Sequence, residues 1–99
     1  MKNYTKYIKS NRVTQKAAAL KYNSQTDSAP VVKAKGMGII ADRIIEIAKE
    51  NNIPIKEDPD LVEILMQIDV DKEIPPELYK VVAEILAFVY RLNNLKSET

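Results

Sequence analysis

The sequence contains no cysteine, no histidine and no tryptophan among its 99 residues. Without cysteine the chain cannot form disulfides, thiolate metal sites or a cysteine nucleophile. Without histidine it lacks the most common zinc ligand and the base of the familiar catalytic triads. Only two glycines and five prolines are present, which is too few for a flexible or fibrous chain. These absences exclude the common triad and zinc enzymes and leave a globular domain as the simplest interpretation.

Long apolar runs are missing as well. No uninterrupted apolar stretch approaches the ~20 residues that a helix needs to cross a bilayer, and no apolar core of a secretion signal follows the first six residues. A chain of 99 residues that is 45% apolar suffices for one domain with one modest core. We therefore expect a single soluble, intracellular domain.

Charge is distributed unevenly along the chain. Residues 1–35 hold eight Lys or Arg and one acidic residue, a net +7, whereas residues 36–99 hold seven basic and thirteen acidic residues, a net −6. The first twelve residues carry no acid and no clean hydrophobic period, so we interpret residues 1–12 as a basic N-terminal arm. Such an arm could tune docking to an acidic partner, an anionic membrane or a nucleic acid, or could be a solvated extension.

Hydrophobic periodicity predicts a series of short elements after this arm. β-Branched and apolar runs bounded by turn formers indicate strands, and apolar spacing of three and four residues indicates helices. Asp58 followed by Pro59 is a strong helix start. The predicted strands span 17–22, 30–35 and 53–56, and the predicted helices span 39–50, a segment from 59, and a segment from 76. This order predicts a small α/β (α+β) fold, a central sheet of three to four strands surrounded by helices.

The predicted helices have recognisable core faces. In the first, Ile40, Ile44, Ile47 and Ala48 share one face. The last helix is expected to be the main core element because its apolar stripe is the longest. That stripe comprises Leu78, Val81, Val82, Ile85, Leu86 and Val89.

A glycine-rich turn offers one alternative function. Gly36-x-Gly38-x-x-Ala41 follows a predicted strand and opens a helix, and the acidic pair Glu57-Asp58 ends the next strand about 20 residues on, as in a dinucleotide-binding fingerprint. The chain provides only one strand-helix-strand unit, however, and such a site needs two. The two glycines are explained as well by a tight strand-to-helix turn.

Nucleic-acid binding through the basic arm is a second alternative. Tyr4, Tyr7 and Tyr22 could stack on bases while the neighbouring lysines contact phosphates. These residues alone do not identify such a function, and we do not expect nucleic acid as a partner. No pattern of catalytic residues is recognisable, so we expect no enzyme activity, no cofactor and no metal site.

Several segments of the chain resemble the cytoplasmic domain of the FlhB/YscU family, the substrate-specificity switch of flagellar and virulence type III export. The resemblance covers about residues 13–93. It is carried by Ala19-Leu20-Lys21-Tyr22, Ser28-Ala29-Pro30-Val31-Val32, Ile53-Pro54, Asp58-Pro59 and, most specifically, the run from Ile74-Pro75-Pro76-Glu77-Leu78-Tyr79 to Leu92.

This resemblance implies a non-enzymatic interaction module of the export apparatus. It implies the family's small sheet surrounded by helices, and binding of flagellar export substrates or of export-gate components. It also implies a cytoplasmic location, at the inner face of the membrane export gate if the basic arm makes peripheral contact with anionic lipid.

The resemblance also locates a degenerate cleavage turn. Family members cut themselves at an Asn-Pro-Thr-His turn, where the asparagine amide attacks its own carbonyl. Counting back without a gap from the matching segment Ala19-Leu20-Lys21-Tyr22 places Arg12-Val13-Thr14-Gln15 at that turn, so only Thr14 matches. We expect a chain that does not cleave itself. Relatives also carry four transmembrane helices before this domain, so we expect a free-standing domain at 13–93 with the arm before it and a short tail at 94–99.

Finally, the resemblance implies a binding surface. In the family, an apolar patch formed by the loop before the second strand and by the last helix recognises export substrates. Ala29, Pro30, Ala83 and Leu86 fall at these positions, and all four are apolar. The periodicity of the last helix alone would instead place Ala83 and Leu86 in the core.

Overall fold

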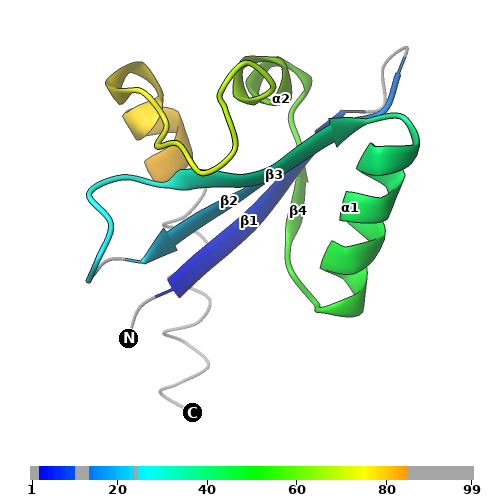
Figure 1. Ribbon diagram of the computed structural model, residues 1–99, viewed down its shortest axis with the longest axis horizontal. Coiled ribbons are helices and arrows are strands. Elements are labelled where there is room, and N and C mark those ends of the chain that lie inside the picture. Colours follow the sequence, from blue (N-terminus) through cyan, green and yellow to red (C-terminus); the bar gives the residue numbers. More distant parts are fainter. Residues whose placement is uncertain (1–2, 11–13, 24, 85–99) are drawn as a thin grey trace.

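The computed structural model describes residues 3–10, 14–23 and 25–84. Four strands form one sheet in the order β3-β2-β1-β4, and helices cover both of its faces (Figure 1). This confirms the predicted fold class. The elements are β1 Asn3–Ser10, β2 Lys16–Asn23, β3 Val31–Met37, α1 Ile39–Glu50, β4 Ile55–Glu57, α2 Pro59–Leu65 and η1 Pro76–Leu78. Residues 79–84 continue η1 as α-helix, and we call the whole segment the 76–84 helix.

The sheet is mixed. β1 pairs antiparallel with β2, and β2 pairs antiparallel with β3, whereas the short β4 pairs parallel with β1. β3 and β4 therefore run in the same direction at opposite edges of the sheet. α1 connects them, and it crosses the two strands that lie between them.

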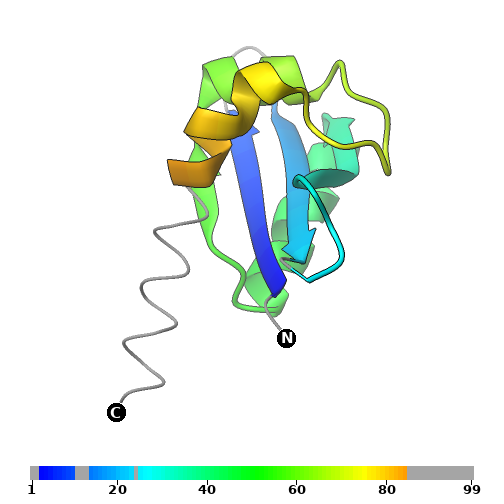
Figure 2. The same cartoon turned by 90° about the vertical axis from the view of Figure 1, so that its left-hand side faces the viewer.

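Two apolar clusters lie on the two faces of the sheet. α1 covers one face, where Ala17, Ala41, Ile44 and Ile45 pack together. α2 and the 76–84 helix cover the other face, and Figure 2 shows the 76–84 helix in front of the sheet with α1 behind it. The larger cluster lies on this second face and comprises Ile8, Ala18, Leu20, Val32, Leu61, Val62, Leu65, Ile74, Leu78 and Val82.

The interpretation of residues 1–12 as an arm is wrong for residues 3–10. These residues form β1, a central strand of the sheet that pairs with β2 along its whole length, from Asn3 opposite Asn23 to Ser10 opposite Lys16. Ile8 has no exposed surface and belongs to the larger core cluster. β1, which lies before residue 13, is therefore part of the folded sheet. Arg12 and the tail at 94–99 lie outside the described residues.

α1 has the predicted bounds, and backbone geometry defines both of its ends. Gly38 at its N-cap has φ 61° and ψ −128°, a conformation open to glycine but strained for other residues. A Cβ atom on Gly36 would lie 2.2 Å from Cγ2 of Ile40, so only glycine permits this close approach of strand and helix. At the other end Asn52 has φ 56°, and the N–H of Ile53 donates to the carbonyl of Ala48 over 2.8 Å, as in a Schellman motif.

The buried face of α1 differs from the predicted one. Ile44 and Ala48 are buried as expected, but Ile40 is 61% exposed and Ala41 and Ile45 take the core positions. The side chain of Ile40 instead lies beside Gly36 at the edge of the sheet, where a Cβ atom on residue 36 would touch it.

α2 begins as the sequence predicts. The side chain of Asp58 accepts a hydrogen bond from the N–H of Leu61 over 3.1 Å, and Pro59 occupies the first turn. β4 spans Ile55–Glu57 and not 53–56. In the described part of the chain, no helix is both long and apolar enough to span a membrane.

Candidate interaction surface

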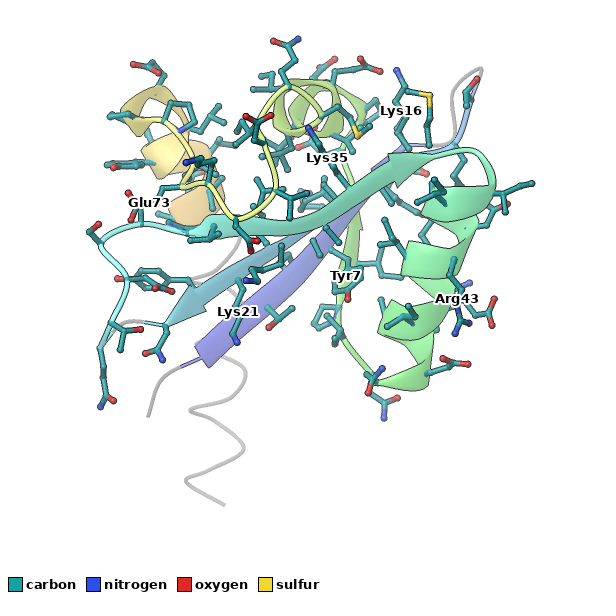
Figure 3. All side chains as sticks on the ribbon, viewed as in Figure 1. Tyr7, Lys16, Lys21, Lys35, Arg43 and Glu73 are labelled. Atoms are coloured by element: carbon teal, nitrogen blue, oxygen red, sulfur yellow. The ribbon has the colours of Figure 1, made fainter. Side chains whose placement is uncertain are left out.

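The loop before β3 is joined directly to the segment that precedes the 76–84 helix. The N–H of Ile74 donates to the carbonyl of Pro30 over 2.9 Å, and Val31 forms an isolated bridge with Glu73. The hydroxyl of Ser28 donates to Oε2 of Glu73 over 2.7 Å, and Figure 3 shows Glu73 beside the start of β3. These contacts join the loop that holds Ala29 and Pro30 to residues 73–74, two residues before the 76–84 helix begins.

The rest of the segment before the 76–84 helix covers the outer edge of β3. The N–H of Val32 donates to the carbonyl of Lys72, and the N–H of Asp71 donates back to the carbonyl of Val32, over 3.0 and 2.7 Å. The ammonium of Lys33 also pairs with Oδ1 of Asp71 at 2.7 Å. These contacts fix the loop, and with it the direction in which the helix leaves the sheet.

The 76–84 helix has three faces that lie in different environments. Residues three or four positions apart share a face of a helix. Leu78 and Val82 are buried in the larger core cluster. Tyr79 and Ala83, also four apart, are exposed. Val81 is 37% exposed and lies with Glu84 along a groove described below.

The four predicted patch residues have different environments. Ala29 is 2% exposed and belongs to the core, Pro30 is half-buried and Ala83 is exposed. Leu86 lies outside the described residues. Pro30 and Ala83 therefore have surface exposed to solvent, whereas Ala29 has almost none. Sequence reasoning missed Tyr79, which is 44% exposed; its four-residue spacing from Ala83 was the available signal.

The turn between β1 and β2 is anchored to α1. The N–H of Gly38 donates to the carbonyl of Gln15 over 2.8 Å, and Nε2 of Gln15 donates to Oδ1 of Asp42 over 2.5 Å. Thr14 is exposed, while Arg12 and Val13 lie outside the described residues. The degenerate cleavage turn thus lies between β1 and β2, whose pairing ends at Ser10 opposite Lys16.

A groove of about 740 Å³ lies between β4 and the 76–84 helix. Lys6 of β1 is one of the residues that line it and is 6% exposed. Burial lowers the pKa of Lys6, and the positive charge of Lys56 lowers that pKa further. Sequence analysis missed this groove because it treated Lys6 as part of a solvated arm. The lining residues are Lys6, Ile55, Lys56, Glu57, Asp58, Val81 and Glu84.

The geometry does not support the dinucleotide alternative. A dinucleotide fingerprint needs its glycine turn and its acidic residue on neighbouring parallel strands, but β3 and β4 lie at opposite edges of the sheet. Three strand spacings of ~4.8 Å separate them by about 14 Å. The carboxylate of Asp58 already caps α2. Gly36 and Gly38 are accounted for by the turn and by the close contact with Ile40.

The structure does not support the nucleic-acid alternative either. Its basic and aromatic residues were expected on a free arm, but Lys6 is buried and Tyr7 packs against the cluster beneath α1. Tyr22 packs against the opposite cluster, and the side chain of Tyr4 is outside the described set. Within residues 3–10, 14–23 and 25–84, no group of three or more metal-ligating side chains gathers at one place.

Comparison with known proteins identifies the family. Residues 13–89 match the model of the FlhB, HrpN, YscU and SpaS family. The chain belongs to this family. The match begins at the β1–β2 turn and continues past the end of the described 76–84 helix, so it includes both segments of the Pro30 and Ala83 surface.

Relatives of two lengths resemble this member of the FlhB/YscU family. YlqH of Bacillus subtilis, described as uncharacterized, is 46% identical over 86 residues, which cover 87% of this chain and 92% of YlqH. The flagellar biosynthetic protein FlhB of Aquifex aeolicus is 52% identical over 77 residues, which cover 77% of this chain but 22% of that protein. The chain thus spans about a fifth of the length of this FlhB relative.

Solved structures of FlhB/YscU domains share the fold. The cytoplasmic domain of FlhB from Shewanella putrefaciens matches with a TM-score of 0.76 and 34% identity, covering 92% of this chain and 70% of that domain. The C-terminal domain of EscU matches with the same TM-score at 24% identity, which shows likeness of fold alone. The chain is therefore an FlhB/YscU-like cytoplasmic domain of the export-apparatus type, as the resemblance implied.

Proposed function

We propose that this chain is a non-enzymatic interaction module of a flagellar or related type III export apparatus, which binds export substrates or gate components in the cytoplasm at the inner face of the export gate. The observation that carries this proposal is the family match across residues 13–89 together with the shared fold. The direct contact of the basic arm with lipid is no longer part of the proposal, because residues 3–10 are a strand of the sheet.

The partner surface is proposed to centre on Pro30, Tyr79 and Ala83. The support is geometric: a hydrogen bond from Ile74 to Pro30 ties the loop to the segment that starts the helix, and Tyr79 and Ala83 share its exposed side. Exposed apolar groups on a rigid frame can bind a partner with little loss of conformational entropy. Leu86 remains a proposed member of this surface.

We propose further that the module keeps β1 and β2 on one uncut chain. In relatives that cleave themselves, the cut falls in the turn between these strands. Here that turn has Arg12 and Val13 in place of asparagine and proline, so it lacks both the attacking amide and the peptide that breaks. A chain of this kind would present the family's binding domain in a permanently uncleaved form.

Binding to purified flagellar export substrates tests the proposed surface. Substituting Ala83→Glu introduces a charge on the exposed side of the helix and should weaken binding at least about fivefold, because a charge must then be desolvated at the contact. Ile64→Glu is the matched control, since Ile64 is an exposed apolar residue of α2, 42% accessible. Equal binding by the two folded variants, or no binding by the unmodified chain, would count against the proposal.

A further inference from the structure

The outer edge of β3 is covered along only part of its length. β3 lies at one end of the sheet order, so one side of the strand pairs with β2 and the other side faces away from it. At the start of the strand the chain covers this outer side itself, since Val32 exchanges backbone hydrogen bonds with Asp71 and Lys72. An antiparallel bridge also joins Val31 to Glu73. The outer edge of β3 thus already accepts one extended segment.

The remaining edge, residues 33–37, has no such cover. The N–H of Gly38 donates to the carbonyl of Gln15, so the backbone of Gly38 faces the β2 side, and this direction alternates from one residue to the next. The N–H and C=O groups of Lys35 and Met37 therefore point away from β2. Within the described part of the chain no hydrogen bond to these groups is found. They form an open strand edge, with which another extended segment can pair.

Exposed apolar side chains flank this open edge on both faces of the sheet. Met37 is 51% exposed and lies on the face of α2, because Lys35, two residues before it, donates from its ammonium to the carbonyl of Met66 at the end of α2 (Figure 3). Ile40 is 61% exposed on the face of α1, where it lies directly beside Gly36. Gly36 has no side chain, so a residue opposite it on an added strand has room to pack against Ile40.

The charge along this edge is positive. Lys33 pairs with Asp71, but the ammonium of Lys35 takes part in no ion pair within the described residues and contacts a backbone carbonyl instead. No acidic residue lies between Val31 and Met37. Two β3 strands from two copies of the chain would bring only lysines together as charged residues, and like charges on paired strands destabilise a sheet. A segment with a carboxylate opposite Lys35 is therefore favoured over a second copy.

We propose that the open edge of β3 binds an extended segment of a partner protein as an added antiparallel strand, with an acidic residue opposite Lys35 and an apolar residue opposite Gly36. The antiparallel direction follows the bridge at the start of the strand. Main-chain hydrogen bonds hold the segment, and its alternate side chains meet Met37 on one face and Ile40 on the other. This site lies at the other end of β3 from Pro30 and does not rest on the proposed function.

A synthetic peptide, acetyl-Thr-Val-Val-Glu-Val-Thr-amide, provides the probe. In the proposed register its first valine lies opposite Met37, its second valine opposite Gly36 and its glutamate opposite Lys35. Binding to the full chain is followed by amide chemical shifts, which should change at residues 33–37 and 40. No shift at millimolar peptide, or shifts that map elsewhere, would overturn the proposal.

N-methylation of the peptide separates strand addition from other contacts. The backbone of Lys35 faces outward, so the N–H of the glutamate opposite it bonds to β3, whereas the N–H of the second valine points away. Methylating the glutamate nitrogen should weaken binding at least about tenfold, and methylating the nitrogen of the second valine should change it less than about twofold. Equal effects of the two methyl groups would refute strand addition.

Variants of the chain and of the peptide test the side-chain contacts. Ile40→Ser should weaken peptide binding about three- to tenfold, because it removes apolar surface beside Gly36. Ile39→Ser is the matched control, since Ile39 is 86% exposed and does not contact Gly36, and this variant should bind as the unmodified chain does. Glutamine in place of the glutamate should weaken binding about two- to fivefold. Equal binding by the two variants, or of the two peptides, would overturn the proposal.

Two further measurements distinguish other occupants. Light scattering at increasing concentration tests a second copy of the chain. Met37→Pro removes an outward N–H, which a strand at the edge of a sheet tolerates, and self-association that this variant abolishes would make the second copy the occupant. Phosphatidylserine vesicles test a membrane, and shifts at residues 37–40 with vesicles but not with the peptide would make lipid the occupant. Either result would overturn the proposal of a partner strand.

Discussion

Replacing Ile8 by alanine tests whether residues 3–10 belong to the core. Ile8 is fully buried in the cluster beneath α2 and the 76–84 helix. The substitution removes three carbon atoms, about 2.4 kcal/mol at ~0.8 kcal/mol per buried methylene, and the cavity left behind brings the expected loss to about 2–5 kcal/mol. For a domain of this size, each kcal/mol lowers the melting temperature by about 4–8 °C, so a fall of at least about 8 °C is expected.

A matched control is available on α1. Ile39 is 86% exposed, so Ile39→Ala makes the same chemical change and should alter the free energy of unfolding by less than about 0.5 kcal/mol. Urea midpoints and melting curves of the two variants are compared. Deleting residues 1–10 should go further and unfold the domain, since β4 then loses its pairing with β1. If Ile8→Ala behaves like Ile39→Ala, or if the truncated chain melts normally, β1 is not a structural strand.

Four further predictions concern particular residues. Gly38→Ala should destabilise the domain by about 1–3 kcal/mol as measured by urea unfolding, because Gly38 has φ 61°. Lys6→Met should stabilise the chain at neutral pH, because folding lowers the pKa of Lys6 from 10.5 and the charged lysine therefore opposes folding. In the unmodified chain the free energy of unfolding should rise with pH between the lowered pKa and 10.5. The variant should not show this rise. Intact mass should show no break between Arg12 and Val13 after days at neutral or mildly alkaline pH, and a clean break there would contradict the degenerate turn. Ala83→Glu should leave the melting temperature within about 3 °C of the parent, because an exposed helical position tolerates glutamate; a larger fall would place Ala83 in the core.

The elements after residue 15 could be predicted because their local signals agree with the tertiary structure. Asp58 and Pro59 start α2 by capping chemistry that needs no distant contact. The polar run after Asn23 separates two strands, and the helix 39–50 is recovered with its bounds. The face of α1 was misjudged at Ile40, whose side chain lies beside Gly36 of β3, a contact with another element that periodicity within the helix does not report.

β1 was missed for a different reason. Its sequence, Asn-Tyr-Thr-Lys-Tyr-Ile-Lys-Ser, is rich in residues with β-propensity, but lysines fall on both faces of the strand. Lys6 is buried all the same, which charge alone does not predict. The strand becomes recognisable only when its partners β2 and β4 are known, and the groove beside it could not be predicted from the sequence for the same reason.

The candidate surface was predictable only in part. The resemblance located Pro30 and Ala83, but the hydrogen bond from Ile74 to Pro30 that ties their segments together joins residues 44 positions apart and has no local signature. Ala29 shows the opposite case: its apolar character suited a contact patch, but the structure places it in the core.

Crosslinking in the organism's own cells tests the central claim, that this chain is an interaction module of the export apparatus. A photo-crosslinking amino acid is placed at position 83, on the exposed side of the 76–84 helix, and at position 72 as a control. The account predicts crosslinks from position 83 to export-gate proteins or flagellar export substrates, and none of these from position 72. If the chain is abundant and folded but position 83 yields no crosslink to any export protein, the claim of an export-apparatus module is contradicted.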